Sequence, residues 1–224
     1  VYTDSKLANT AGYFCFGSVN TASATIEKTG KAVVPDPEPE PTYKVVDVTE
    51  MLADTANWVS ASWGAPLSFA DGSVTASNTA GYSVGGYNKA VQLDTVYRFK
   101  YTHKRGSGAT GFSFNFAAGD VYWNGGIQVD FNDSSAAVHY HKGHSDLVYE
   151  SSQTFKAEDD TVYDIAFGVL KVAENTVKVY MTINGNAFFE DTTAVADALF
   201  VTTPLYFGIY ASRATATISK PDTK

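Results

Sequence analysis

The amino-acid sequence predicts an all-β protein, an antiparallel β-sandwich of the jelly-roll type. Its 224 residues include 14 Tyr, 14 Phe and 3 Trp, with many Thr, Ser and Val, a composition that favours pleated strands. Short segments of alternating apolar and polar residues are separated by turn-forming residues. No segment keeps a helical period over three turns. Roughly a dozen such segments are typical of two packed antiparallel sheets.

The predicted strands begin at residue 43 and follow at near-regular spacing. A short helical stretch is expected at 50–58. Asp71-Gly72 and Asn184-Gly185 have the composition of tight hairpin turns. The predicted strands are 43–49, 67–77, 80–91, 95–104, 111–119, 125–131, 137–143, 146–151, 162–172, 175–183, 186–191, 205–211 and 214–220.

A proline- and glutamate-rich linker at residues 32–42 separates two parts of the chain. Proline stands at every second position from 35 to 41 with acidic residues between, which favours an extended, solvated spacer. Before it, the segment 13–28 (YFCFGSVNTASATIEK) is similar to 206–220 (YFGIYASRATATISK). We therefore predict that residues 1–31 are the closing strands of a preceding related repeat and that residues 43–224 are one sandwich module.

The charge and hydrophobicity of the sequence restrict the kinds of partner that the protein is expected to bind. The formal net charge of −8 argues against nucleic acid or an anionic membrane surface as the main partner. No apolar run approaches the roughly 20 residues of a membrane span, so membrane insertion is not expected. Val1 and the lack of a leader segment suggest a mature fragment. The single cysteine, Cys15, is predicted to be a small buried apolar residue.

Segments 161–191 and 204–220 resemble the second half of concanavalin-like or laminin-G-like jelly rolls, and segments 67–77 and 97–103 resemble the first half. This resemblance covers residues 43–220 and is architectural. It implies the concanavalin-like sandwich fold. Such sandwiches recur as sugar-binding modules of secreted bacterial glycan-degrading systems, so it also implies a carbohydrate ligand and a secreted or cell-surface location. Because the same fold serves adhesins, enzymes and spacers, function must be argued from the site.

Three successive predicted strands carry polar residues that alternate with large apolar ones. If these strands form a meander, one face is apolar core and the other gathers Asn115, Gln128, Asp130, His139 and His141. Amide, carboxylate and imidazole groups can pair with sugar hydroxyls, each of which both donates and accepts hydrogen bonds. These five residues are therefore the predicted ligand-binding face.

Aromatic residues outside the predicted core would supply stacking surfaces for a sugar ring, whose C–H face is apolar. Tyr122 and Trp123 follow the first of the three strands, and Trp63 lies in a loop. Tyr180 is predicted on a sheet face that it shares with other polar residues. Trp58, next to the predicted helix, is expected in the core.

Other interpretations of the same residues remain open. The polar face can be simply the solvated side of an antiparallel sheet. His139, His141 and Asp130 together suggest a metal site, although such a site usually needs another fixed ligand. No cofactor is expected, while a structural calcium ion is an open alternative, with oxygen ligands from 158–160 or 131–135.

The sequence lacks the motifs of the common hydrolases. Glycan cleavage needs two facing carboxylates, and the Glu residues are expected at linker, loop and turn positions, Glu150 among them. We therefore predict a non-catalytic carbohydrate-binding module that directs a secreted or cell-surface bacterial protein to a polysaccharide, such as starch or a plant wall glycan. Other modules of the same protein are expected neighbours. The alternative is a structural or adhesive surface repeat that binds a protein partner or acts as a spacer.

Overall fold

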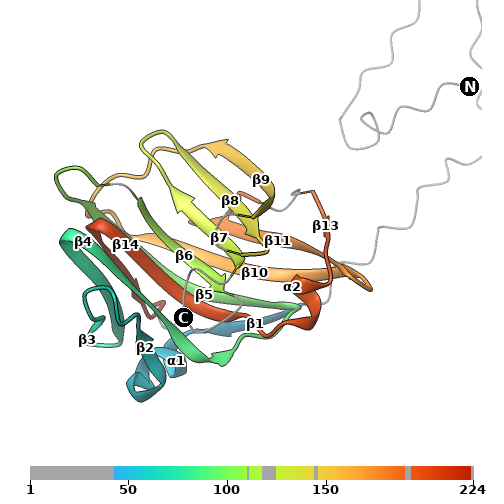
Figure 1. Cartoon of the computed structure of the whole chain (residues 1–224), viewed down its shortest axis with the longest axis horizontal. Coiled ribbons are helices and arrows are strands. Elements are labelled where there is room, and N and C mark those ends of the chain that lie inside the picture. Colours follow the sequence, from blue (N-terminus) through green and yellow to red (C-terminus); the bar gives the residue numbers. More distant parts are fainter. Residues whose placement is uncertain (1–42, 110, 118–124, 144–145, 190–192, 223–224) are drawn as a thin grey trace, which may run out of the picture. The chain divides into compact units, whose positions relative to one another are not determined.

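A computed structural model of the chain describes residues 43–109, 111–117, 125–143, 146–189 and 193–222 (Figure 1). The predicted repeat at 1–31 and the linker at 32–42 lie outside the described residues and stay predictions. The two described α-helices have five and four residues, too few to span a membrane.

The described elements are almost all strands, as the composition predicts. In the N-terminal half they are β1 (Lys44–Asp47), α1 (Thr49–Ala53), the 3-10 helix η2 (Thr55–Asn57), β2 (Trp58–Ser60), β3 (Ser68–Ala70), β4 (Ser73–Ala90), β5 (Thr95–Arg105) and β6 (Gly111–Ala117). The rest are β7 (Gly126–Phe131), β8 (Ser135–His141), β9 (Leu147–Thr154), β10 (Tyr163–Ala173), β11 (Thr176–Ile183), β12 (Asn186–Ala187), β13 (Val195–Ala196), α2 (Leu199–Thr202) and β14 (Tyr206–Ser219).

The strands form one continuous curled sheet in the order β12-β11-β10-β5-β14-β6-β7-β8-β9. The curl brings β6 over β10, two strands that are not hydrogen-bonded neighbours: the rings of Phe116 and Phe167 lie 4.7 Å apart between centroids. Phe114 likewise packs 5.0 Å from Phe99 of β5. The sheet therefore closes into the two-layered sandwich that the sequence predicts (Figure 1). The ring contacts place an aromatic core between the layers.

Two long strands, β4 and β14, pass from one layer to the other. The first half of β14 pairs with β6 and its second half with β5, and the register changes between Ser212 and Ala214. Arg213, at this corner, has a φ of 50°, the geometry of a β-bulge, which bends a strand. At the matching corner of β4, Asn78 Oδ1 accepts hydrogen bonds from the backbone N–H groups of Ala80 and Gly81.

These corners explain where the predicted strand boundaries differ from the structure. The sequence predicts separate strands at 67–77 and 80–91 and at 205–211 and 214–220, because small and polar residues interrupt the alternation there. In the structure each interruption is a bend inside one strand. The hairpin turns at Asp71-Gly72 and Asn184-Gly185 are confirmed, with all four residues at positive φ, as is a short helix next to a buried Trp58.

The core consists of aromatic and β-branched side chains from both layers. Phe99, Phe114, Phe131, Phe167 and Phe207 are each at most 1% exposed. Burial of one such side chain stabilises a fold by about 1.5–3 kcal/mol. This core holds the backbones of β6, β7 and β8 rigidly, and it thereby fixes the positions of the polar side chains on the opposite side of the same strands.

Candidate functional site

The polar residues predicted to share a face do so in the structure. The antiparallel register aligns Asn115 of β6 with Gln128 of β7, Gln128 with His139 of β8, and His139 with Glu150 of β9. Since paired residues on neighbouring strands project to the same side of a sheet, these four form a row across the strands. They project away from the aromatic core.

A second row lies one step along the strands. Tyr210 of β14 pairs with Ser113 of β6, and Ser113 pairs with Asp130 of β7. We call Ser113, Asn115, Gln128, Asp130, His139 and Glu150 together the polar face.

Hydrogen bonds and charges connect the two rows around Asp130. Gln128 Nε2 donates a hydrogen bond to Asp130 Oδ1. His139 Nδ1 lies 3.4 Å from Asp130 Oδ2, and its other nitrogen, Nε2, lies 3.8 Å from Glu150 Oε1. The imidazole ring of His139 therefore stands between two carboxylates. Hydrogen-bonding groups in such a chain hold one another in fixed orientations.

Much of the polar face is buried, which contradicts the interpretation of a simply solvated sheet surface for its central residues. Ser113 is 0% exposed, Asn115 3% and Gln128 8%. A buried polar group without a hydrogen-bond partner costs about 1–3 kcal/mol. Within the described residues, Asn115 Oδ1 accepts no hydrogen bond. It lies against Gly208, where a methyl group would collide with it.

Burial also acts on the charge of Asp130. Desolvation raises the pKa of its carboxyl group, and the hydrogen bond from Gln128 and the nearby His139 only partly oppose this increase. A carboxylate kept in such an environment costs stability. Buried carboxylates with a raised pKa are concentrated at functional sites.

A strip of aromatic rings continues the polar face toward the other edge of the layer. Tyr210, Tyr82 of β4 and Trp63 follow one another, with ring centroids 6.2 and 6.0 Å apart. Tyr210 is 7% exposed, whereas Tyr82 is 45% and Trp63 50% exposed. We call these three residues the aromatic strip; the rings of Tyr210 and Tyr82 are tilted by 30° to each other, those of Tyr82 and Trp63 by 73°, and together they offer apolar surface next to hydrogen-bonding groups.

Four residues of this region, Ser113, Glu150, Tyr82 and Tyr210, are not among the site residues predicted from the sequence. Glu150, in the predicted strand 146–151 but not predicted at the site, lies in β9 and pairs with His139. Tyr82 and Tyr210 were overlooked although Tyr210 alternates with Phe207 and Ile209 of the core. That alternation was a usable indication that Tyr210 points away from the core.

The other predicted site residues are spread over different places. His141, two residues after His139 on the same strand, has its ring 5.8 Å from that of His139. Trp63 is exposed, as predicted. Tyr180 is not near the polar face: it lies on β11, in the other layer, with its ring 5.0 Å from that of Tyr43. Tyr122 and Trp123 lie outside the described residues.

No group of three or more His, Cys, Asp or Glu that could hold a metal ion occurs among the described residues. The carboxylates suggested for calcium contact basic side chains instead. Asp159 Oδ1 lies 3.0 Å from Arg105 Nη1, Asp133 Oδ1 lies 3.2 Å from Arg105 Nε, and Asp160 Oδ2 lies 2.8 Å from Lys104 Nζ. These ion pairs place the positive charges of Arg105 and Lys104 beside the loop carboxylates.

Comparison with known proteins identifies the fold. No protein-family model matches the sequence, and no curated protein matches it. Among solved structures, laminarinase from Flavobacterium sp. UMI-01 is similar over 75% of this chain and 92% of its own, with a TM-score of 0.50 and 12% identity. The luminal domain of VIP36, solved with Ca²⁺ and Man3GlcNAc, has a TM-score of 0.44 at 9% identity, covering 76% of this chain and 87% of that domain.

The CBM2 module of the evolved Dit protein of Lactobacillus casei BL23 phage J-1 covers 84% of this chain and 94% of its own, with a TM-score of 0.37 and 11% identity. The similarity to laminarinase confirms the concanavalin-like jelly-roll fold. At 12% identity it establishes the fold alone.

Proposed function

We propose that this protein is a non-catalytic carbohydrate-binding module that holds a neutral polysaccharide across the polar face. The observation that carries the proposal is the buried polar face itself. Asn115 and Gln128 are mostly buried and Asp130 has a raised pKa, while the side chains of Asp130, His139 and Glu150 keep 18%, 22% and 50% of their surface exposed to a ligand. Such an arrangement costs stability and is explained by a ligand that uses it.

The chemistry of the face suits sugar hydroxyl groups. Gln128 and Asn115 carry both donor and acceptor groups, while Asp130 and Glu150 only accept hydrogen bonds when ionised. The aromatic strip supplies the apolar surface that the C–H face of a sugar ring needs. The two carboxylates would repel a polyanionic chain, which favours a neutral glycan such as starch or a plant wall polysaccharide.

The size of the face favours a chain rather than a single sugar. Adjacent strands lie about 4.8 Å apart, so the path from Tyr82 on β4 through β14, β6, β7 and β8 to Glu150 on β9 spans about 24 Å. Several sugar units are needed to cover this distance. The jelly-roll fold shared with a laminarinase is compatible with such a ligand.

The environment of the carboxylates supports binding rather than cleavage. Glycosidases place two carboxyl groups on opposite sides of the scissile bond, with space between them for substrate or water. Here the ring of His139 stands between Asp130 and Glu150. A second candidate function, acid–base cleavage of a glycan, is favoured by the raised pKa of Asp130.

We further propose that the module belongs to a secreted bacterial protein and acts at the cell surface or beside an enzyme. The predicted linker and the predicted preceding repeat would place several weak sites on one chain. Linked sites gain avidity through their effective concentration. Each module then needs only modest affinity for the polysaccharide.

Affinity electrophoresis in gels that contain soluble starch, xylan or laminarin tests this proposal. At least one of the three is expected to retard the protein, and Gln128→Ala to weaken that binding about tenfold or more, because it removes an amide from the face and the hydrogen bond that orients Asp130. Gln92→Ala is the matched control, since Gln92 is exposed and lies in the loop between β4 and β5.

Three outcomes would contradict the proposal in different ways. Equal retardation of the wild type and Gln128→Ala would exclude the polar face as the binding site. Release of new reducing ends from a retarding glycan, lost in Asp130→Asn, would establish the enzyme instead. An unretarded wild type would favour the structural or adhesive repeat that the sequence leaves as an alternative.

A further inference from the structure

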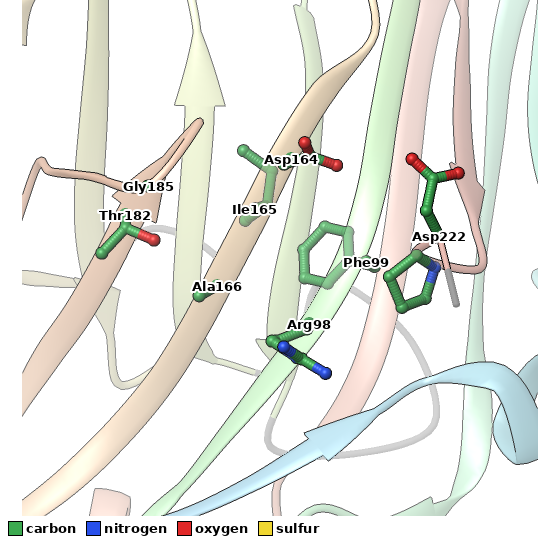
Figure 2. Close-up of a pocket in the computed structure, with 9 residues that line it drawn as sticks. Arg98, Phe99, Asp164, Ile165, Ala166, Thr182, Gly185 and Asp222 are labelled. Atoms are coloured by element: carbon green, nitrogen blue, oxygen red, sulfur yellow. The ribbon is translucent and has the colours of Figure 1, made fainter. Parts of the chain in front are cut away.

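The layer opposite the polar face carries its own hollow on its outward side. A cavity of about 380 Å³ lies over β5, β10 and β11 and is closed on one side by the segment after β14. We call it the outer pocket; its lining includes Arg98, Asp164, Ala166, Thr182, Pro221 and Asp222. Figure 2 shows Thr182 on one side and Asp222 on the other, with Ala166 and Arg98 between them.

The hollow arises from a small side chain between larger ones. Ala166 of β10 pairs with Thr182 of β11 on one side and with Arg98 of β5 on the other, so its methyl group forms a low floor between two walls. Two residues further along β10 is Gly168, which pairs with Tyr180. The layer therefore has its smallest outward side chains along the middle of β10.

Charged groups line the pocket in defined positions. Arg98 donates to both carboxylate oxygens of Asp47, at 2.7 and 3.0 Å, which fixes the guanidinium plane. Lys100 Nζ lies 2.6 Å from Asp222 Oδ2 and ties the segment after β14 to the sheet. Among the described residues, the exposed carboxylate of Asp164 takes part in no ion pair, so its oxygens remain available as acceptors.

The pocket also has apolar surface and a nearby aromatic pair. The ring of Pro221 and the methyl group of Ala166 present carbon atoms to the cavity. Tyr180 lies two residues before Thr182 on the same side of β11, and its ring packs 5.0 Å from that of Tyr43. Carboxylate acceptors and a hydroxyl beside apolar carbon atoms are a combination that suits sugar rings.

We propose that the outer pocket is a second, weaker carbohydrate subsite, which binds a neutral oligosaccharide segment on the opposite side of the sandwich from the polar face. This inference rests on the proposed function. One module with a subsite on each outward face holds two polysaccharide chains at once. The protein therefore cross-links its ligand without needing a second copy of itself.

The test compares two single variants and their combination. Ala166→Leu fills the pocket, Gln128→Ala disables the polar face, and the double variant carries both changes. Ala173→Leu is the matched control, since Ala173 is exposed at the end of the same strand. All are compared in gels that contain soluble starch, xylan or laminarin, and thermal unfolding verifies that each variant folds.

We expect Ala166→Leu to weaken binding about threefold, while Ala173→Leu leaves it unchanged. Gln128→Ala is expected to keep a weak residual retardation that the double variant loses. Mixed with a dissolved polysaccharide that binds it, the wild type is expected to produce turbidity by cross-linking, and Ala166→Leu is not. Asp164→Asn, which fills no space, should weaken the residual binding of Gln128→Ala.

The outcomes separate this inference from the proposed function. If Gln128→Ala alone abolishes all retardation, the polar face is the whole site and the second subsite is refuted. If Ala166→Leu alone abolishes binding and Gln128→Ala does not, the outer pocket is the principal site and the proposed function of the polar face is wrong. A wild type that none of the three glycans retards overturns both.

Discussion

The two outward faces of the sandwich use polar residues in opposite ways. On the polar face, Asn115 and Gln128 are at most 8% exposed, and Asp130 has its pKa raised by burial. On the other layer, Arg98 forms a solvent-exposed ion pair with Asp47, and the two side chains are 33% and 40% exposed. Exposed ion pairs typically contribute no more than about 1 kcal/mol, whereas buried polar groups are costly unless paired.

This difference shows that the two faces place their polar groups in different environments, buried on the polar face and exposed to solvent on the outer face. Both faces alternate with the same aromatic core, and both carry carboxylates and hydrogen-bonding groups. Among the described residues of these two faces, Ser113, Asn115 and Gln128 of the polar face are buried, whereas Arg98, Asp47 and Asp164 of the outer face are at least partly exposed. Substitutions there should change stability and binding together, while substitutions on the outer face should change binding with little effect on stability.

The largest expected difference in stability is between two glycine-to-alanine substitutions, one at the polar face and one at the outer pocket. Gly208→Ala places a methyl group against Asn115 Oδ1 and 3.2 Å from the Gly85 carbonyl oxygen, and we expect a loss of about 2–3 kcal/mol through overpacking. At Gly185, which lines the outer pocket, a methyl group meets nothing within 4 Å. Gly185→Ala should cost only about 1 kcal/mol, because φ is 76°.

Urea unfolding of the two variants and the wild type checks this contrast. Affinity electrophoresis should also show weaker glycan binding for Gly208→Ala, since Asn115 must move. Equal losses of stability in both variants would mean that the polar face is no more tightly packed than the outer pocket.

His103 is buried between the two layers and belongs to neither outward face. His103 of β5 is 1% exposed, and burial, together with the charge of Arg105, lowers its pKa from 6.5 to about 4, although Asp159 opposes the shift. The unfolded chain therefore binds a proton at a higher pH than the folded one. Stability is expected to fall by about 2 kcal/mol as the pH decreases from 6.5 to about 4, after an allowance for solvent screening.

Denaturant titrations at several pH values, for the wild type and His103→Gln, measure this effect. The variant should lose the His103 component of the pH dependence, even if its stability is uniformly lower. Identical slopes in both proteins would place the acid sensitivity elsewhere, for instance among the carboxylates near Arg105.

Neutralising one carboxylate on each face, Asp130 and Asp164, should give a smaller contrast in stability. Since burial raises the pKa of Asp130, its ionised form destabilises the fold above that pKa. We expect Asp130→Asn to stabilise the protein by about 1 kcal/mol at pH 7 while weakening glycan binding. This advantage should shrink as the pH falls toward 3.8, because the wild-type carboxyl group then becomes neutral.

Asp164→Asn, on the exposed outer face, is the matched substitution. It should change stability by less than about 0.5 kcal/mol at either pH. Thermal unfolding at pH 7 and pH 4 tests both variants. A destabilised Asp130→Asn would mean that Asp130 holds the fold together and is not kept for a ligand.

Local sequence patterns predicted much of this site because its central strands are consecutive. Residues 111–117, 126–131 and 135–141 form a meander, so alternation along each strand sufficed to bring Asn115, Gln128 and His139 together. The fold class followed from the same alternation and from the turn residues. Neither inference needed knowledge of distant contacts.

Long-range pairing explains what the sequence could not provide. Tyr82 joins Tyr210 because β4 pairs with β14, more than a hundred residues away, and no local pattern encodes that contact. Tyr180 shows a second limit of prediction from local sequence patterns. Alternation correctly places it with Thr182 on one side of its strand, but it cannot tell which of the two layers that strand joins.

The smallest expected effect concerns the ion pair on the outer face. Although Arg98 binds Asp47 through two hydrogen bonds, both side chains are partly exposed, and solvent screens such pairs. A double-mutant cycle with Arg98→Met and Asp47→Asn should give a coupling energy of about 0.5 kcal/mol that disappears in about 1 M salt. The equivalent cycle on the polar face, with His139→Gln and Asp130→Asn, should give a larger value that salt changes little. If instead the outer pair couples as strongly as the polar one, burial does not separate the two faces, and the outer pocket is as rigidly organised as the polar face.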